Sequence, residues 1–145
     1  MRPVPKQFKV NFDFGLKYPP ELQYLTVDHL HHGKDFACPK GIPVIFAVDG
    51  ILNFKGFKRG YGHCVIVKFK TGILWSGKTF RLILAHLEAI TTDRKIGQRV
   101  GKWESCGLSG DSGMAVGHPH LHVECQELKD GIWVAINPSF VVGSS

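Results

Sequence analysis

The sequence predicts an all-β fold, a single compact domain of antiparallel sheets. A chain of 145 residues has the length of one domain. Its apolar segments are short and rich in β-branched or aromatic residues, and 17 glycines and 8 prolines favour turns between them. The period of an amphipathic helix is absent from these segments, and Asp-Gly pairs follow two of them, as in tight hairpin turns.

The first 30 residues are predicted to form an irregular arm that wraps the domain. Four prolines interrupt any helix there. The apolar stretch 8–12 is suited to pairing as an edge strand. We therefore expect an amino-terminal arm over 1–30, the folded domain over 31–140 and a short tail over 141–145.

The strands expected in the domain follow from runs of apolar residues and the turns between them. Residues 43–48 and 51–54 flank Asp49-Gly50 and predict a hairpin. Residues 64–69 and 80–85 predict two buried strands, bounded by turns that contain Gly60, Gly62, Gly72 and Gly77.

Towards the end of the chain, residues 87–93 have room for one helical turn at most, because Thr91, Thr92 and Gly97 disfavour anything longer. Residues 121–128 and 132–136 flank another Asp-Gly turn and predict a second hairpin. The strands together predict a single sandwich or a compact two-sheet unit.

The net charge of the sequence favours one class of binding partner. Eighteen lysines and arginines against 12 acidic residues give a net charge of +6, which favours an anionic partner such as a wall polymer, a nucleic acid or a membrane surface. No helix-turn-helix, RNP or finger pattern is present, so a nucleic-acid partner is not expected. No apolar stretch reaches the length that spans a bilayer, so membrane insertion is not expected either.

The start of the chain and its cysteines bear on location. Residues 1–9 lack the apolar region and cleavage site of a secretory signal, so we expect the protein not to leave a cell by the usual route. The four cysteines are widely spaced and form no C-x-x-C pair. We expect them to be reduced, small apolar residues. The three tryptophans, Trp75, Trp103 and Trp133, are expected to be packing residues.

The eight histidines gather in two clusters that suggest a metal site. His31 and Asp35 lie on a segment that Gly33 favours as extended, which would place both side chains on one side. His120 and His122 alternate with Leu121 on a predicted strand, so the two histidines share one face. Two imidazoles and one carboxylate form a common ligand set for catalytic zinc. His31, Asp35 and one of His120 or His122 would complete such a set.

Five segments of the sequence carry a family pattern in order and with matching spacing. They are His31–Ala37 (H-x-x-x-D), Gly41–Gly50 (G-x-P-V…A…D-G), Leu84–Leu87 (A-H-L), Gly97–Val100 with Gly107–Gly110 (G-Q-x-V…G-L-S-G) and Pro119–Glu124 (P-H-L-H-x-E). In these segments the chain resembles the M23 zinc metallopeptidases, the lysostaphin-type and LytM-type endopeptidases that cut peptidoglycan. Trp103 departs from the pattern, since a turn glycine is common there.

The resemblance implies a LytM-like fold, a duplicated hybrid motif with a groove that holds the metal. It implies that His31, Asp35 and His122 bind one Zn²⁺ per chain, with His86 and His120 as catalytic histidines. The substrate implied is bacterial peptidoglycan, cut in a cross-bridge or stem peptide.

Three further residues are assigned to the surroundings of this site. Glu124 is expected to accept a hydrogen bond from a ligand histidine. His118 is expected at the rim of the groove. Tyr61 is expected in the groove, at the end of the basic and aromatic loop 55–61, which is either an ordinary solvated turn or a surface for anionic glycans.

Two other functions are weighed against the endopeptidase. A cupin-type metal enzyme would use His120, His122 and Glu127, but Met114 and Val134 stand where that motif needs glycine. A zinc-stabilised wall-binding or regulatory module of the same fold remains the alternative. The missing signal and single domain favour a phage wall hydrolase, virion-associated or held in the host cytoplasm before release, with a phage tail or lysis assembly as partner. Export of a bacterial protein by another route is the alternative.

Overall fold

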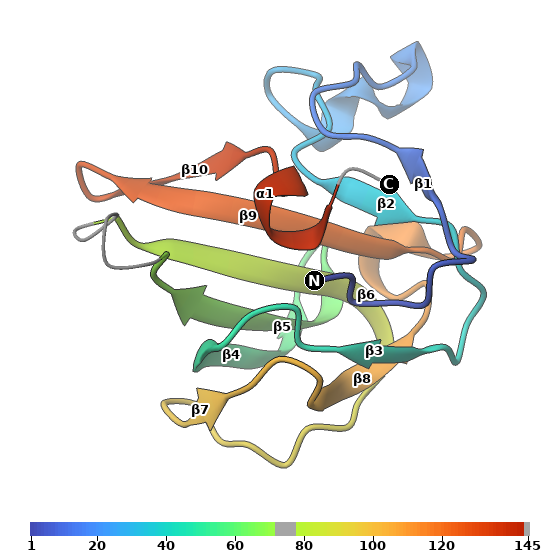
Figure 1. Ribbon diagram of the computed structural model, residues 1–145. Helices are drawn as coiled ribbons and strands as arrows, with labels where there is room; N and C mark the ends of the chain where they lie inside the picture. Colours follow the sequence, from blue (N-terminus) through green and yellow to red (C-terminus); the bar gives the residue numbers. More distant parts are fainter. Residues whose placement is uncertain (72–77, 144–145) are drawn as a thin grey trace.

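The computed structural model describes residues 1–71 and 78–143 as an almost entirely antiparallel β protein (Figure 1). The predicted fold class is therefore confirmed. The strands are β1 (Val10–Phe12), β2 (Lys34–Phe36), β3 (Pro43–Ile45), β4 (Gly50–Lys58), β5 (Gly62–Phe69), β6 (Phe80–Ile90), β7 (Arg99–Val100), β8 (Ser105–Ser109), β9 (Leu121–Lys129) and β10 (Ile132–Ile136). Helical structure among these residues is limited to η1 (Pro20–Leu25), η3 (Gly113–Ala115) and α1 (Ser139–Val142).

The ten strands of the described residues form one branched sheet in the order β1-β2-β9-β6-β5-β4-β7. One edge of β9 pairs with β6, while its other edge is shared by β2 and β10. One edge of β6 pairs first with β9, over Phe80–Ala85, and then with β8, over Leu87–Ile90. The sheet branches at that change of partner, and β3 pairs with β8 alone.

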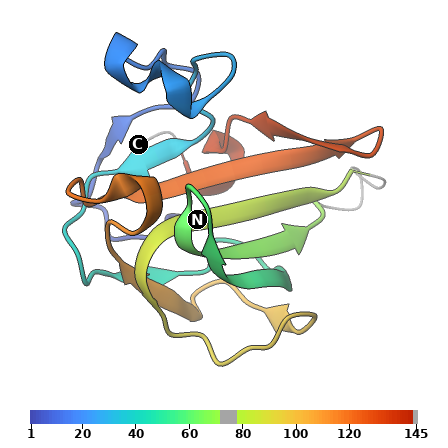
Figure 2. The ribbon, with the colours of Figure 1, turned by 180° about the vertical axis from the view of Figure 1, so that it is seen from behind.

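The two faces of the sheet have different roles. Leu121, Val123 and Cys125 of β9 lie in the main hydrophobic core, together with side chains from β3, β5, β6 and β8. His122 and Glu124 alternate with them and lie on the opposite face, which is toward the viewer in Figure 2. The predicted alternation on this strand is confirmed, and it separates core from chemistry.

The amino-terminal segment wraps the sheet as a mostly irregular arm, and the predicted edge strand is confirmed as β1. It pairs with β2, with Val10 opposite Phe36. The arm continues through η1, which begins at Pro20 and is drawn at the top of Figures 1 and 2.

Two expectations about the strands are wrong, and the one helical turn allowed at 87–93 does not form. The 43–54 hairpin does not form, because β3 pairs with β8 and β4 pairs with β5. Asp49 accepts a hydrogen bond from the Lys102 backbone, and Gly50 allows close approach, since a Cβ there would lie 2.5 Å from the Lys68 carbonyl oxygen. No helical turn forms at 87–93, where β6 continues to Ile90 against β8. The strands build one continuous sheet, not two separate ones, because β6 pairs with both branches.

The expectation for the cysteines is confirmed, whereas the expectation for the tryptophans is only partly met. All four cysteines are free and buried, which confirms them as core residues. Trp103 is 75% exposed in a left-handed turn (φ 78°), so its expected packing role is wrong. Trp133 is partly buried beneath the Arg81 guanidinium, 4.4 Å from the ring centroid. Gly72, Trp75 and Gly77 lie outside the described residues.

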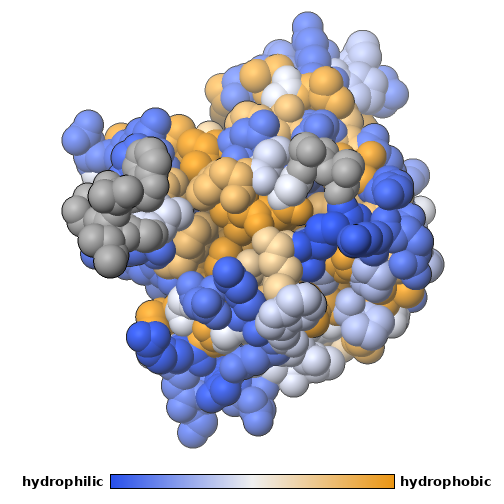
Figure 3. Space-filling view, in the orientation of Figure 1, coloured by the Kyte–Doolittle hydropathy of each residue, from blue (hydrophilic) through white to orange (hydrophobic). Residues whose placement is uncertain are grey.

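Apolar side chains are also exposed on the side of the molecule that carries α1. Figure 3 shows them near the middle of this view. Phe140 of α1 is 54% exposed there and packs against Phe80 at 5.5 Å between ring centroids. Within residues 1–71 and 78–143, no helix has the length and apolar character needed to cross a membrane.

Candidate metal centre

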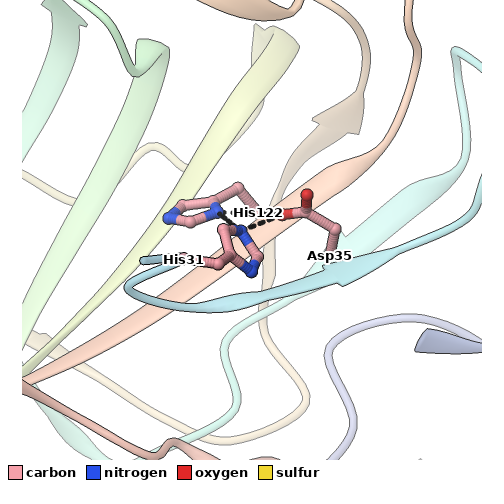
Figure 4. A group of neighbouring side chains, drawn as sticks. All are labelled: His31, Asp35 and His122. Atoms are coloured by element: carbon pink, nitrogen blue, oxygen red, sulfur yellow. Dashed lines mark hydrogen bonds and ion pairs between the residues drawn. The ribbon is translucent and has the colours of Figure 1, made fainter. Parts of the chain in front are cut away.

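Three side chains from β2, the segment just before it, and the neighbouring β9 meet on the groove face of the sheet. His31 precedes β2, Asp35 lies within β2 and His122 lies opposite Asp35 on β9 (Figure 4). His31 Nε2 lies 3.1 Å from Asp35 Oδ1 and 3.3 Å from His122 Nδ1, and His122 Nδ1 lies 2.9 Å from Asp35 Oδ1. One donor atom from each residue therefore lies within 4.8 Å of the others, close enough to hold one metal ion.

The cluster depends on close approach of the two strands. A Cβ atom at Gly33 would lie 2.4 Å from the Val123 carbonyl oxygen and 2.8 Å from His122 Cε1. Only glycine leaves both atoms where they are. The H-x-x-x-D segment therefore needs glycine for packing between strands, since the left-handed region of backbone space is not used there.

The second ring nitrogen of each histidine is held by an oxygen that can only accept. His31 Nδ1 donates to the Asp13 carbonyl oxygen over 3.0 Å, and His122 Nε2 donates to Glu124 Oε1 over 3.0 Å. These bonds fix the rings and leave His31 Nε2 and His122 Nδ1 directed at Asp35. Such outer hydrogen bonds are the usual support of metal-binding histidines. The structure thus places Glu124 at the expected position relative to His122.

The pKa values of His122 and Asp35 show that the cluster favours positive charge. Burial lowers the pKa of His122, but hydrogen bonds to Asp35 and Glu124 outweigh burial and raise it to about 10. Burial raises the pKa of Asp35, but hydrogen bonds from His122 and His31 outweigh burial and hold it well below its ordinary value. An imidazolium therefore lies between two carboxylates, at a site that favours positive charge.

Two further histidines face the same groove. His86 Nδ1 donates to the Ser112 carbonyl oxygen over 2.8 Å, and His120 Nδ1 donates to the His118 carbonyl oxygen over 2.7 Å. Their rings lie 4.8 Å apart, edge to face, and His120 Nε2 lies 3.6 Å from Asp35 Oδ2. Each ring keeps Nε2 available on the groove side.

His86 reaches the groove through a break in the alternation of β6. Leu84 and Leu87 lie in the main core, whereas Ala85 packs on the groove face and His86 lines the groove. His86 has a positive φ of 61°, and the pairing register of β5 and β6 shifts around it, between His63 and Val65. A bulge of this kind re-aims a side chain, and strained backbone of this kind clusters at functional sites.

The surroundings of His86 keep its ring neutral. Burial, followed by the charges of His122 and His120, lowers its pKa to about 4, although the Ser112 carbonyl and Asp35 act in the opposite direction. At neutral pH its Nε2 is therefore an unprotonated acceptor.

The groove is a cavity of about 620 Å³ between the arm and the β4–β5 and η3 segments. Tyr61 and His118 line it, as does Arg59, its one lysine or arginine among the described residues. The Tyr61 hydroxyl donates to Glu124 Oε2 over 3.0 Å, and burial followed by the charge of Glu124 raises the pKa of Tyr61. Residues 55–58 of the loop 55–61 belong to β4.

The remaining histidines lie apart from the cluster. His32 pairs with Asp28 on the exposed arm, over 2.9 Å. His63 is exposed and meets Phe57 edge to face at 5.3 Å. His29 is exposed in a left-handed conformation, with φ of 64°.

Sequence reasoning missed the contribution of the arm to this groove. Phe12 and Tyr18 line it, and both rings contact the ring of His31. Burial, followed by the charge of Asp35, raises the pKa of Tyr18 to about 12, so its hydroxyl keeps its proton. The aromatic residues of the arm were the available signal, but their position depends on how the arm folds back.

The donor set of the cluster suits zinc. Zinc in proteins is held by imidazole nitrogens and carboxylate oxygens, and three protein ligands leave one position open at a catalytic site. The available His31 and His122 nitrogens and the Asp35 carboxylate are such a set, on the wall of an open groove. The residues present therefore fit a zinc ion.

Comparison with known proteins agrees with this geometry. The family model of peptidase family M23 matches residues 29–138. The chain belongs to peptidase family M23. This M23 domain is 33% identical over 118 residues to the DD-carboxypeptidase/endopeptidase Mpg of Neisseria meningitidis, covering 81% of this chain and 24% of Mpg. It is 35% identical over 123 residues to the peptidoglycan DD-endopeptidase ShyA of Vibrio cholerae, covering 84% of this chain and 26% of ShyA. The M23 domain thus spans about a quarter of the length of these relatives.

Solved structures show the same M23 fold. A zinc-containing peptidase from Vibrio cholerae superposes with a TM-score of 0.68 at 26% identity, covering 92% of this chain and 37% of that one. The catalytic domain of lysostaphin from Staphylococcus simulans superposes with a TM-score of 0.72 at 22% identity, covering 95% of this chain and 94% of that one. The lysostaphin-like fold expected from the sequence is confirmed.

Proposed function

We propose that this chain is a zinc-dependent endopeptidase that hydrolyses peptide bonds in bacterial peptidoglycan. The observation that carries the proposal is the open groove in which His31, Asp35 and His122 converge, with His86 and His120 beside them. Membership of the M23 family and relatives named as DD-endopeptidases support the reaction and the substrate.

The proposed role of each residue follows from the atom that it directs into the groove. His31 Nε2, Asp35 and His122 Nδ1 would hold the zinc ion, which supplies a water of lowered pKa and polarises the scissile carbonyl. The neutral His86 ring can accept a proton at Nε2 while Nδ1 stays bonded to the Ser112 carbonyl. His120, 4.8 Å away between ring centroids, is placed to share the proton or to stabilise developing negative charge. Glu124 keeps the His122 ring in place.

The biological setting that we propose is wall lysis by a phage protein, virion-associated or released from the host cytoplasm, with a tail or lysis assembly as partner. The net charge of +6 supports an anionic wall polymer as the target. Export of a bacterial protein to its own wall is the alternative for the same chemistry.

The test is a digest of purified peptidoglycans that differ in their cross-links. The zinc-loaded parent, the His120→Ala variant and a His63→Ala control are incubated with each, and released fragments are read by mass spectrometry. We expect new amino termini from the parent and the control, lost with chelator or with His120→Ala. Zinc binding without cleavage of any wall would instead favour a zinc-stabilised wall-binding module of the same fold.

A further inference from the structure

The amino-terminal arm surrounds the first residue of the metal cluster. The Phe12 ring is stacked on the His31 ring with 4.3 Å between centroids, and Tyr18 meets the same ring edge-on at 5.7 Å. The Asp13 carbonyl accepts the His31 Nδ1 proton. Three residues of the arm thus contact one imidazole, and all three precede the segment 29–138 that matches the family model.

The backbone of the arm is tied to His31 as well. The Gly15 N–H donates to the His31 carbonyl over 2.8 Å, and the His31 N–H donates to the Leu16 carbonyl over 2.8 Å. Residues 13–16 are therefore hydrogen-bonded along the backbone of His31. The strand β1, which comes just before them, pairs with β2. Both ends of the His31–Asp35 segment are aligned by the arm.

An ion pair between a buried lysine and a half-exposed carboxylate fixes the residue that holds the His31 ring. Asp13 Oδ1 accepts from Lys34 Nζ over 2.7 Å and from the Phe14 N–H over 2.7 Å. The Lys34 side chain is only 1% exposed, next to Asp35 in the sequence. A buried ammonium needs a nearby anion, so Lys34 holds the arm at Asp13.

We propose that the arm is a positioning element for the metal centre: the Asp13–Lys34 pair and the Phe12 ring hold His31 with Nε2 facing Asp35 and His122. Either ring nitrogen of His31 could face the metal site. Because Nδ1 donates to the Asp13 carbonyl, Nε2 is the nitrogen that faces it. The inference rests on the proposed zinc site but adds residues outside the family segment to it. Asp13 and Lys34 act through His31, and Phe12 also lines the groove.

The test compares zinc affinity across matched arm variants. Asp13→Ala removes the carboxylate that pairs with Lys34, and Phe12→Ala removes the stacked ring but keeps that carboxylate. Asp28→Ala is the control, because the Asp28 carboxylate, also in the arm, pairs with a histidine outside the metal cluster, the half-exposed His32. Zinc affinity is measured by competition with a chromophoric chelator, and thermal unfolding with chelator reports the fold.

We expect Asp13→Ala and Phe12→Ala to bind zinc about 10- to 100-fold more weakly, as for other outer hydrogen-bond partners of metal ligands. Asp28→Ala should match the parent, and Asp13→Asn, which keeps an accepting oxygen but loses the charge, should recover part of the affinity. Should Phe12→Ala and a folded Asp13→Ala bind zinc as tightly as the parent, or should Asp28→Ala lose as much, the positioning role is wrong. A parent chain that binds no zinc would instead overturn the proposed function itself.

Discussion

Four histidines of the groove each have one ring nitrogen bonded to an oxygen that can only accept a proton. The acceptors are the carbonyls of Asp13, Ser112 and His118 and the carboxylate of Glu124. The four remaining nitrogens are thereby directed to the groove before any ligand arrives. At the scale of single residues, one nitrogen of each ring therefore holds the side chain in place, and the other is available for metal binding or proton transfer.

The neutral His86 ring leads to a first prediction. His86→Ala should lower kcat about 10²- to 10⁴-fold, the usual contribution of a positioned acid or base, because it removes the unprotonated acceptor beside the metal cluster. Zinc affinity should change little, since His86 lies outside the three-residue cluster. The measurement is hydrolysis of a purified wall fragment alongside zinc competition. His63→Ala, an exposed histidine on the neighbouring strand, is the matched control, and near-parental kcat in His86→Ala would contradict the assigned role.

The raised pKa of His122 leads to a second prediction, about protons. With its pKa near 10, the metal-free His122 ring is protonated at pH 8, but a ligand nitrogen must be deprotonated. His122 should therefore contribute about one proton to the release on zinc binding at pH 8, and this contribution should disappear as pH rises above about 10. Calorimetric titration in two buffers of different ionisation enthalpy measures this number. Identical heats in both buffers would show that His122 is neutral before zinc binds.

At the scale of elements, the feature that decides the site is the bulge in β6. Strict alternation places His86 on the same face as Leu82 and Leu84, inside the core. One extra residue, at the point where β6 changes partner from β9 to β8, turns His86 to the groove instead. Periodicity in the sequence cannot show such an insertion, so only the family pattern pointed to this histidine.

The close approach of β2 and β9 leads to a third prediction. Gly33→Ala should destabilise the fold by about 1–3 kcal/mol, because the new Cβ would overlap the Val123 carbonyl and press on the His122 ring. Zinc affinity should fall with it. Chemical denaturation and zinc competition measure the two effects. Gly101→Ala is the control, since its Cβ would meet no atom closer than 3.5 Å; equal behaviour of the two variants would show that β2 moves freely.

At the scale of the whole molecule, the fold class was readable because short apolar runs and glycine turns are local signals. The last hairpin, over 121–136, was predicted correctly because its strands pair with each other across the Asp-Gly turn. The hairpin expected around Asp49-Gly50 failed because β3 finds its partner 60 residues away, at β8. Pairing at that distance depends on the branch in β6, which no local pattern encodes.

The same contrast holds for the site. His31, Asp35 and the H-x-H pair were visible as residues of the right type at the right spacing, but the choice of His122 over His120 was not. It depends on the register that sets His122 opposite Asp35. The supporting contacts of Phe12 and Asp13 were invisible, because they arise only when the arm folds back over the groove face.

A fourth prediction concerns the stability of the entire chain. Zinc at 1,000 times its dissociation constant should stabilise the fold by about 4 kcal/mol, because a cluster assembled from β2 and β9 exists only in the folded chain. Thermal unfolding with zinc should therefore be shifted up relative to unfolding with chelator. Asp35→Ala should remove the shift. A parent that melts at the same temperature in both conditions would show that zinc binds elsewhere or not at all.

Residues near both ends of the described chain meet on the core side of the sheet, away from the groove. Val4 and Val142 pack into the same core, and the Met1 amino group contacts the Val141 carbonyl (Figure 1). A polypeptide that precedes Met1 would therefore begin on the core side of the sheet, away from the groove. The groove would then stay accessible, so the proposed peptidase could be joined at that end to neighbours of different architecture.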